Sequence, residues 1–197
     1  MIRLLPLLMI LLLGQLLSGC ATAPPPPPPA PQTLNYQEII RTLEKRTPEV
    51  AKNYFGFPYK LAANPDRVRA ADCTHLVCAV TRNSLENTPY RFAPYYMASG
   101  AMMDSTYAIS RDELRAGDII IFADEKKKQI EHAGIVVAKN KEQIRFVHAS
   151  SSKGVMETST LDIGYRSYWQ RRFDSYRRWK PQVFALRASN LLAANYP

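Results

Sequence analysis

The stretch HAGIVVAKNKEQIRFVHAS, residues 132 to 150, holds two apolar segments with a polar stretch between them. Their β-branched residues and the intervening polar residues predict two strands joined by a hairpin turn. If the hairpin folds about Asn140, His132 lies opposite His148 in the ladder. Because side chains alternate between the two faces of a sheet, both histidines then lie on the same face. The sequence therefore predicts a neighbouring pair of histidines.

The residues upstream of this hairpin predict one more strand and two helices. Residues 119–122 are apolar throughout and follow a turn, which indicates a buried strand. Residues 35–56 carry apolar side chains at helical spacing, and we expect Pro48 to interrupt or restart that helix. A short helix is expected near residues 95–103, within an irregular segment rich in aromatic residues and methionine.

The segment DCTHLVCAV begins at Asp72 and predicts a helix that runs to about residue 85. Cys73, Leu76, Val77 and Val80 recur at the spacing of one helical face, and Asp72 is a typical N-cap residue.

The position of Cys73 in the first turn of this helix favours a reactive thiol, because unpaired N–H groups and the helix dipole lower a thiol pKa there. Cys78 lies about 140° further round the helix, so the two sulfurs are badly placed to share a metal ion or a disulfide, and we expect Cys78 to be buried or inert. His75 lies about 200° from Cys73, which makes it a poor general base and favours a cleft wall or a surface position. Taken alone, Cys73 fits a small apolar core residue equally well.

Six blocks of the sequence together resemble the NlpC family of papain-like cysteine peptidases, in order and at similar spacing, over most of residues 36–181. The blocks are GFPYKLAANPDRVRAADC (56–73), DCTHLV (72–77), LRAGDIIIF (114–122), HAGIVV (132–137), FVHASSSKGV (146–155) and YWQRRF (168–173).

This resemblance implies an α+β fold, in which a nucleophile helix packs on a central antiparallel β-sheet that supplies the histidines. The segment YRSYWQRRFDSYRRW, residues 165–179, would be a terminal strand whose aromatic side chains pack on the fold. Members of the family hydrolyse amide bonds of bacterial wall peptides, typically between γ-D-glutamate and a diamino acid.

By the same resemblance, Cys73 is the nucleophile, His132 the general base and acid, and His148 the residue that orients His132. Tyr59, Asp72 and Thr74 are the corresponding candidates for oxyanion and substrate binding; the Cys73 backbone N–H is a further oxyanion donor. The family commonly reads Asp-Cys-Ser-Gly or Asp-Cys-Ser-Ala, whereas this chain has Thr74 and His75 after the cysteine. Thr74 retains a hydroxyl, but His75 replaces a small residue.

The first residues are typical of export and lipidation. Residues 1–19 have one early arginine and a leucine-rich run, as in a signal peptide. The run ends in LSGC, which resembles a bacterial lipobox and makes Cys20 the expected lipidation site. Residues 20–34 contain six consecutive prolines and predict an extended tether. The alternatives are a plain signal peptide with an incidental Cys20, and a proline-rich recognition ligand.

The remaining chain is expected to form one catalytic domain over residues 35–187 and a C-terminal tail over residues 188–197. We expect a monomer that is anchored to the membrane through Cys20. Ala21 after the lipobox favours the periplasmic face of the outer membrane, should the cell be Gram-negative.

The formal net charge of +9 favours an anionic partner such as lipid, nucleic acid or an acidic wall polymer. We expect no nucleic-acid partner, because an exported protein rarely meets one, and the expected substrate is the stem peptide of peptidoglycan. The carboxylates show no metal-ligand spacing, so no cofactor or metal is expected. Two alternatives remain: a thiol acyltransferase or lipid hydrolase on a related fold, and an inactive envelope scaffold that binds wall peptide.

Overall fold

The computed structural model describes residues 33–126 and 129–187. The predicted signal peptide, the lipidation site Cys20, nearly all of the tether and the C-terminal tail lie outside the described residues.

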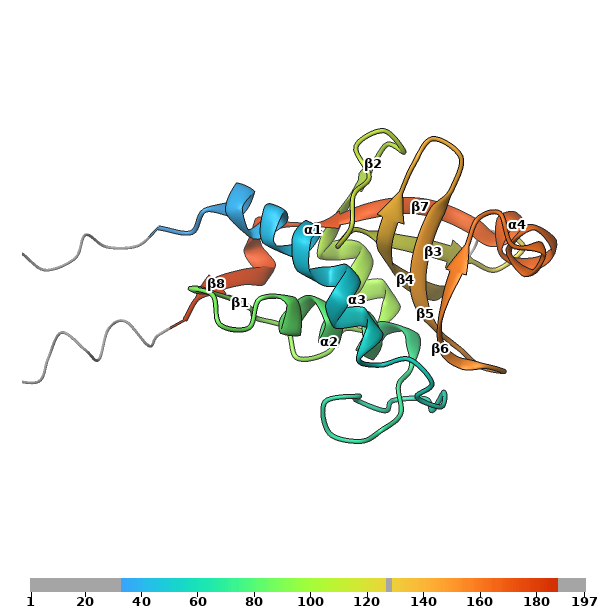
Figure 1. Cartoon of the computed structure of the whole chain (residues 1–197), viewed down its shortest axis with the longest axis horizontal. Helices are drawn as coiled ribbons and strands as arrows, with labels where there is room; N and C mark the ends of the chain where they lie inside the picture. Colours follow the sequence, from blue (N-terminus) through green and yellow to red (C-terminus); the bar gives the residue numbers. More distant parts are fainter. Residues whose placement is uncertain (1–32, 127–128, 188–197) are drawn as a thin grey trace, which may run out of the picture. The chain divides into compact units, whose positions relative to one another are not determined.

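Two long helices lie together on one side of the fold (Figure 1). α1 spans Tyr36–Lys52 and α2 spans Cys73–Ser84. Contrary to expectation, Pro48 lies inside α1 without interrupting it. The carbonyl that Pro48 deprives of a partner belongs to Glu44, an exposed residue that water can reach, and the buried face of the helix continues past the proline to Ala51.

A six-stranded antiparallel sheet, in the order β2-β7-β3-β4-β5-β6, forms the centre of the domain. A separate two-stranded sheet pairs β1 with β8. The strands are β1 (Tyr90–Phe92), β2 (Thr106–Ile109), β3 (Ile119–Ala123), β4 (Ile130–Lys139), β5 (Ile144–Ser150), β6 (Gly154–Ser159), β7 (Phe173–Trp179) and β8 (Phe184–Leu186). The predicted segments 119–122, 132–139 and 144–150 are therefore confirmed as strands.

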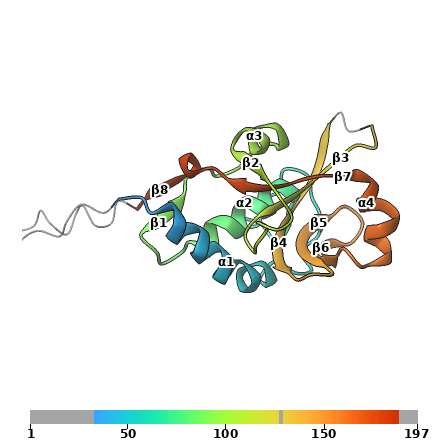
Figure 2. The same cartoon turned by 90° about the horizontal axis from the view of Figure 1, so that it is seen from above.

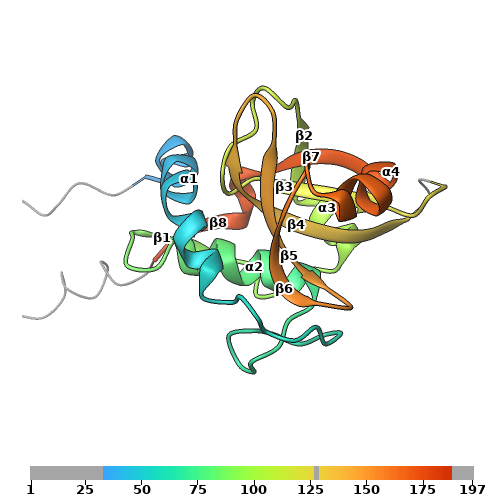
Figure 3. The same ribbon diagram turned by 45° about the vertical axis from the view of Figure 1, so that its right-hand side comes forward.

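The central sheet has an apolar cluster on each face. Ile119 and Ile121 belong to the cluster that includes the buried faces of α1 and α2, whereas Ile120 and Phe122 point the other way. The second cluster packs against the segment that contains Tyr165, and Figures 2 and 3 show this segment, with α4, across the sheet from α1. Burial on both faces explains why residues 119–122 are apolar throughout.

The hairpin register differs from the one expected. β4 pairs with β5 through Ile135 opposite Val147 and Val136 opposite Phe146, with an irregularity before Ala138. The strands are therefore offset by two residues, and His132 does not lie opposite His148. The turn is longer than a fold about Asn140 requires, because the Asn140 side chain accepts hydrogen bonds from both Glu142 and Gln143 N–H groups and holds the connection open. An even offset keeps both histidines on one face.

The segment 165–179 is a strand only in its second half. Tyr165–Trp169 forms a π-helical turn, and α4 (Gln170–Arg172) follows it before β7 begins. The expected terminal strand is thus wrong for the first half, where the Tyr165 and Trp169 side chains fill the second apolar cluster instead of extending the sheet. The predicted short helix is α3 (Ser99–Asp104), slightly later than expected. Among the described residues, no helix has the length and apolar character needed to cross a bilayer.

Candidate active site

Cys73 is the first residue of α2, and Asp72 is its N-cap. The Asp72 Oδ1 accepts the His75 backbone N–H at 2.8 Å, which satisfies one of the donors that a helix start leaves free. The helix start therefore fixes the position of the Cys73 thiol, as the sequence predicted.

The Cys73 sulfur lies against strand β4, where the Ala133 backbone N–H is directed at it. Burial raises the pKa of the Cys73 thiol above its ordinary value, while the N–H groups of Ala133, Thr74 and Cys73 itself oppose the rise. The expectation of a lowered pKa is thus wrong, because desolvation of a thiolate outweighs the dipole and N–H groups at the helix start.

His132 and His148 are in direct contact. The Nε2 of His132 lies 2.9 Å from the Nδ1 of His148, although the residues are diagonal in the ladder. Diagonal neighbours on one face of a sheet are within reach of long or aromatic side chains. The predicted histidine pair exists, and the bond leaves the Nδ1 of His132 as the nitrogen available to a nucleophile.

Cys73 is brought to this pair through the backbone, since Ala133 directly follows His132 in β4. In the described part of the chain, no hydrogen bond joins the Cys73 sulfur directly to the His132 ring. Such bonds are often long in a substrate-free site and tighten when substrate binds.

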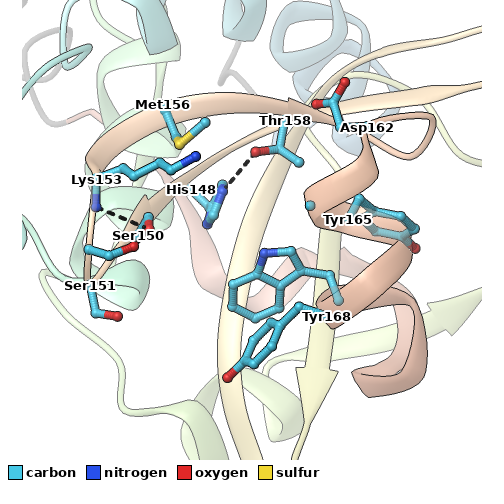
Figure 4. Close-up of a pocket in the computed structure, with 12 residues that line it drawn as sticks. His148, Ser150, Ser151, Lys153, Met156, Thr158, Asp162, Tyr165 and Tyr168 are labelled. Atoms are coloured by element: carbon cyan, nitrogen blue, oxygen red, sulfur yellow. Dashed lines mark hydrogen bonds between the residues drawn. The ribbon is translucent and has the colours of Figure 1, made fainter.

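Two further residues complete the environment of the histidines. The Nε2 of His148 lies 3.0 Å from the Thr158 hydroxyl of β6 (Figure 4). The indole of Trp169 stacks on the His132 ring, with centroids 4.6 Å apart and planes 24° apart. Sequence reasoning missed Thr158, which only the β5–β6 pairing brings to His148; it assigned Trp169 to packing alone, although YWQRRF was among the blocks that carried the family resemblance.

Both rings are held neutral at neutral pH. Burial lowers the pKa of His148 to about 4. The pKa of His132 is lowered well below its ordinary value, first by burial and then by the neighbouring His148. A neutral imidazole next to a protonated thiol is therefore the resting arrangement.

Asp72 is the centre of a network at the helix start. Its carboxylate accepts hydrogen bonds from the Ala62 N–H at 2.9 Å and from the Thr74 hydroxyl at 3.2 Å, besides the capping bond. The Nδ1 of His75 lies 2.9 Å from the Asp72 Oδ2. The Thr74 hydroxyl is buried and turned to Asp72.

His75 is buried and is not a surface histidine. Its ring stacks on Tyr96 with centroids 3.9 Å apart and planes 16° apart. The contacts of this ring are with Asp72 and Tyr96, and the two downstream histidines pair with each other, so the geometry agrees with leaving His75 out of the catalytic set.

Tyr59 lies close to the candidate nucleophile. Its segment pairs with Ala71 in an isolated parallel bridge, just before Asp72. Burial and the nearby Cys73 and Asp72 raise the pKa of the Tyr59 phenol, which therefore stays protonated and can donate a hydrogen bond.

Cys78 and Asp118 lie outside the candidate site and are packed or hydrogen-bonded within the fold. Cys78 is fully buried, as expected, and burial raises the pKa of its thiol to about 12. Asp118 accepts hydrogen bonds from Arg178 at 2.7 and 2.8 Å, which ties β7 to the turn before β3. Among residues 33–126 and 129–187, no group of three or more His, Cys, Asp or Glu side chains is arranged to hold a metal ion.

A pocket of about 470 Å³ opens beside His148 (Figure 4). The β5–β6 hairpin forms one wall and the helical segment after β6 forms the other. The candidate site thus consists of a thiol at a helix start, a neutral histidine pair on the sheet and an adjoining pocket.

Comparison with known proteins shows which family the chain resembles. Residues 56–178 match the sequence model of the NlpC/P60 family. The chain is 28% identical over 172 residues to a probable endopeptidase, NlpC, of Escherichia coli strain K12, an alignment that covers 86% of this chain and 97% of that protein.

Two solved structures are also similar. A Staphylococcus aureus protein described as similar to lipoprotein, NLP/P60 family, has 24% identity and a TM-score of 0.49, over 77% of this chain and 44% of that chain. The P60 domain of an M. avium subspecies paratuberculosis antigen has 13% identity and a TM-score of 0.44, over 71% of this chain and 95% of that one. The chain thus spans less than half of the staphylococcal protein.

Proposed function

The chain belongs to the NlpC/P60 family of cell-wall peptidases, and from this premise we propose that it is a lipid-anchored peptidoglycan hydrolase with a Cys-His-His mechanism. Support comes from one observation above all. The Ala133 N–H is directed at the Cys73 sulfur, and Ala133 directly follows His132, whose far nitrogen is bonded to His148.

Acylation begins with proton transfer from the Cys73 thiol to the Nδ1 of His132 as the sulfur attacks the amide carbonyl carbon. For this the Nδ1 must carry a lone pair, so the Nε2–H of His132 donates to the Nδ1 of His148, and the Nε2–H of His148 donates to Thr158. Because the thiol pKa is raised and the imidazole pKa is lowered, the base acts during attack and not by forming a stable ion pair beforehand.

The tetrahedral intermediate places negative charge on the former carbonyl oxygen. The Cys73 backbone N–H and the protonated Tyr59 phenol are the donors assigned to it. The C–N bond then breaks, His132 returns its proton to the leaving amine, and the acyl group stays on sulfur as a thioester. Water attacks the thioester while His132 accepts its proton, which releases the carboxylic acid and the Cys73 thiol.

The proposed substrate is the stem peptide of peptidoglycan, cut between γ-D-glutamate and a diamino acid. This assignment rests on the family resemblance. Asp72 is the proposed substrate-binding carboxylate, and Thr74 supports it through the hydroxyl bond.

Lipidation of Cys20 would anchor the protein in the cell envelope, on the periplasmic face of the outer membrane, as a monomer on a proline-rich tether. Metabolic labelling with an alkyne palmitate, with Cys20→Ser as the matched control, tests the anchor. Label retained by Cys20→Ser contradicts this part of the proposal.

The test of the reaction uses the full chain in detergent, next to its Cys73→Ala variant, with purified muropeptides. Mass spectrometry is expected to show loss of the γ-glutamyl bond with the parent protein only. Intact muropeptides that still bind would favour an envelope scaffold. Intact muropeptides together with cleaved phospholipids would favour a lipid hydrolase or acyltransferase.

A further inference from the structure

The proposed reaction indicates which part of the substrate would lie near the pocket beside His148. In that reaction His132 gives its proton to the leaving amine, so the residue that carries the amine lies on the histidine side of the nucleophile. Trp169 stacks on the His132 ring and also lines the pocket. The pocket is therefore next to the residue whose amine leaves, a step that rests on the proposed function.

The wall of this pocket formed by the β5–β6 hairpin is held in a fixed position. The Val155 N–H donates to the Phe57 carbonyl at 2.8 Å, and the Gly56 N–H donates to the Val155 carbonyl at 2.9 Å. Gly154 has a φ of +75°, and a Cβ there would come within 2.4 Å of the Phe57 carbonyl oxygen. Only glycine permits this close approach, so the hairpin is braced against the segment that leads to Tyr59.

Lys153 brings a cation to this rigid wall. It lines the pocket, and Figure 4 shows its side chain extending over the pocket toward His148. Its backbone N–H donates to the Ser150 hydroxyl at 3.3 Å, which holds the turn. Among the described residues the Lys153 ammonium has no hydrogen-bond or ion-pair partner, whereas Asp162, which enters the pocket from another side, accepts the Ser159 N–H at 2.7 Å.

An ammonium without a partner at the edge of a pocket next to the histidine pair suits an anionic ligand group. We propose that the pocket holds the residue whose amine leaves, and that Lys153 determines specificity by binding a free carboxylate of that residue. Two carboxylates have the required chemistry: the α-carboxylate of a chain-terminal residue, and the second carboxylate of a dicarboxylic diamino acid. The apolar faces of Trp169 and Met156 would contact its methylene groups.

Binding to the full-length Cys73→Ala protein tests this without any turnover. Calorimetry would compare three γ-glutamyl peptides that differ in their last residue. In the first, this residue is a dicarboxylic diamino acid whose α-carboxyl is amidated, so that only the second carboxylate is free. In the second it is lysine with a free α-carboxylate, and in the third it is lysine α-carboxamide, which has neither carboxylate. We expect at least one carboxylate peptide to bind about tenfold more tightly than the carboxamide. The peptide that binds more tightly than the carboxamide identifies which carboxylate is bound.

Substitutions of Lys153 in the Cys73→Ala protein test whether this residue causes the tighter binding of the carboxylate peptide. Lys153→Met should abolish the preference for the carboxylate, and Lys153→Arg should keep it. Lys45→Met, which changes an exposed lysine on α1 that does not line the pocket, should leave it unchanged.

Equal affinities for all three peptides in the parent, or a preference that survives Lys153→Met, would overturn the inference. The outcome is separate from that of the proposed function. If the protein hydrolyses muropeptides but shows no Lys153-dependent preference, the peptidase function is supported and the role of Lys153 is refuted. If it shows a Lys153-dependent preference but no hydrolysis, carboxylate binding by Lys153 is supported and the peptidase function is refuted.

Discussion

His132 and His148 share a hydrogen bond of 2.9 Å even though neither lies opposite the other in the β4–β5 ladder. The contact exists because both side chains lie on one face of the sheet and reach diagonally across it. Thr158 on the next strand holds the far nitrogen of His148. Three neighbouring strands therefore contribute one side chain each to a single line of hydrogen bonds that ends at the Nδ1 of His132.

Thr158→Val keeps the side-chain shape but removes the hydroxyl that bonds to His148. We expect kcat/KM on muropeptides to fall about tenfold, since one hydrogen bond orienting the histidine pair is lost, with KM little changed. Thr158→Ser is the matched control and should restore activity. A loss of the same size in Thr158→Ser would mean that packing of the methyl group, and not the hydroxyl, is responsible.

The rate of Cys73 alkylation by iodoacetamide should rise steadily between about pH 6 and pH 9, because the thiolate reacts and burial raises the pKa of this thiol. Peptide mapping by mass spectrometry follows Cys73 separately from Cys78, which should stay unmodified in the native protein. A rate that is already flat below about pH 7 would show a preformed thiolate and contradict the raised pKa.

Stability should fall on acidification partly through His148. Its pKa is lowered from 6.5 to about 4, so below pH 6.5 the unfolded chain binds a proton that the folded chain excludes, and stability is lost as pH falls toward 4. His148→Gln removes this contribution. Urea unfolding between about pH 7 and pH 4.5 should show a loss larger in the parent by on the order of 3 kcal/mol. Equal losses in both proteins would refute the buried, neutral His148.

His75 should be dispensable for the chemistry. His75→Phe keeps a ring against Tyr96 but loses the bond to Asp72, so we expect kcat to stay within about threefold of the parent and the unfolding free energy to drop by about 2 kcal/mol. His132→Ala, measured in parallel, should lose nearly all activity. If His75→Phe were as inactive as His132→Ala, the choice of base would be wrong.

Most helices and strands could be predicted from the sequence, because their formation depends on neighbouring residues. The Asp72 cap, the apolar face of α2 and the apolar strand β3 follow from residue types and spacing. Pro48 and the segment 165–172 were misjudged. At Pro48, packing of the buried face of the helix outweighed the local preference of proline. The strand expected over the first half of 165–179 came from the family resemblance, and the structure has helical turns there whose Tyr165 and Trp169 side chains pack in the second apolar cluster.

The candidate site was predicted only in part, because some of its contacts depend on how the strands pair. Cys73, His132 and His148 were identified as a set, with Tyr59, Asp72 and Thr74 around them, by residue type and by resemblance. Thr158 carried no signal of its own, since only the pairing of β5 with β6 brings it to His148. The need for a glycine at position 154 was likewise not predicted, since only the close approach to the Phe57 carbonyl oxygen reveals it.

The sequence by itself determined that the two histidines share a face, because alternation along a strand survives any even shift in register. Only the tertiary structure decided the ionisation of the site. The first turn of a helix predicts a lowered thiol pKa, yet α2 is packed against the sheet so that its Cys73 thiol is desolvated, and the pKa rises. Burial depends on every element that covers a group, and no local stretch of sequence contains that information.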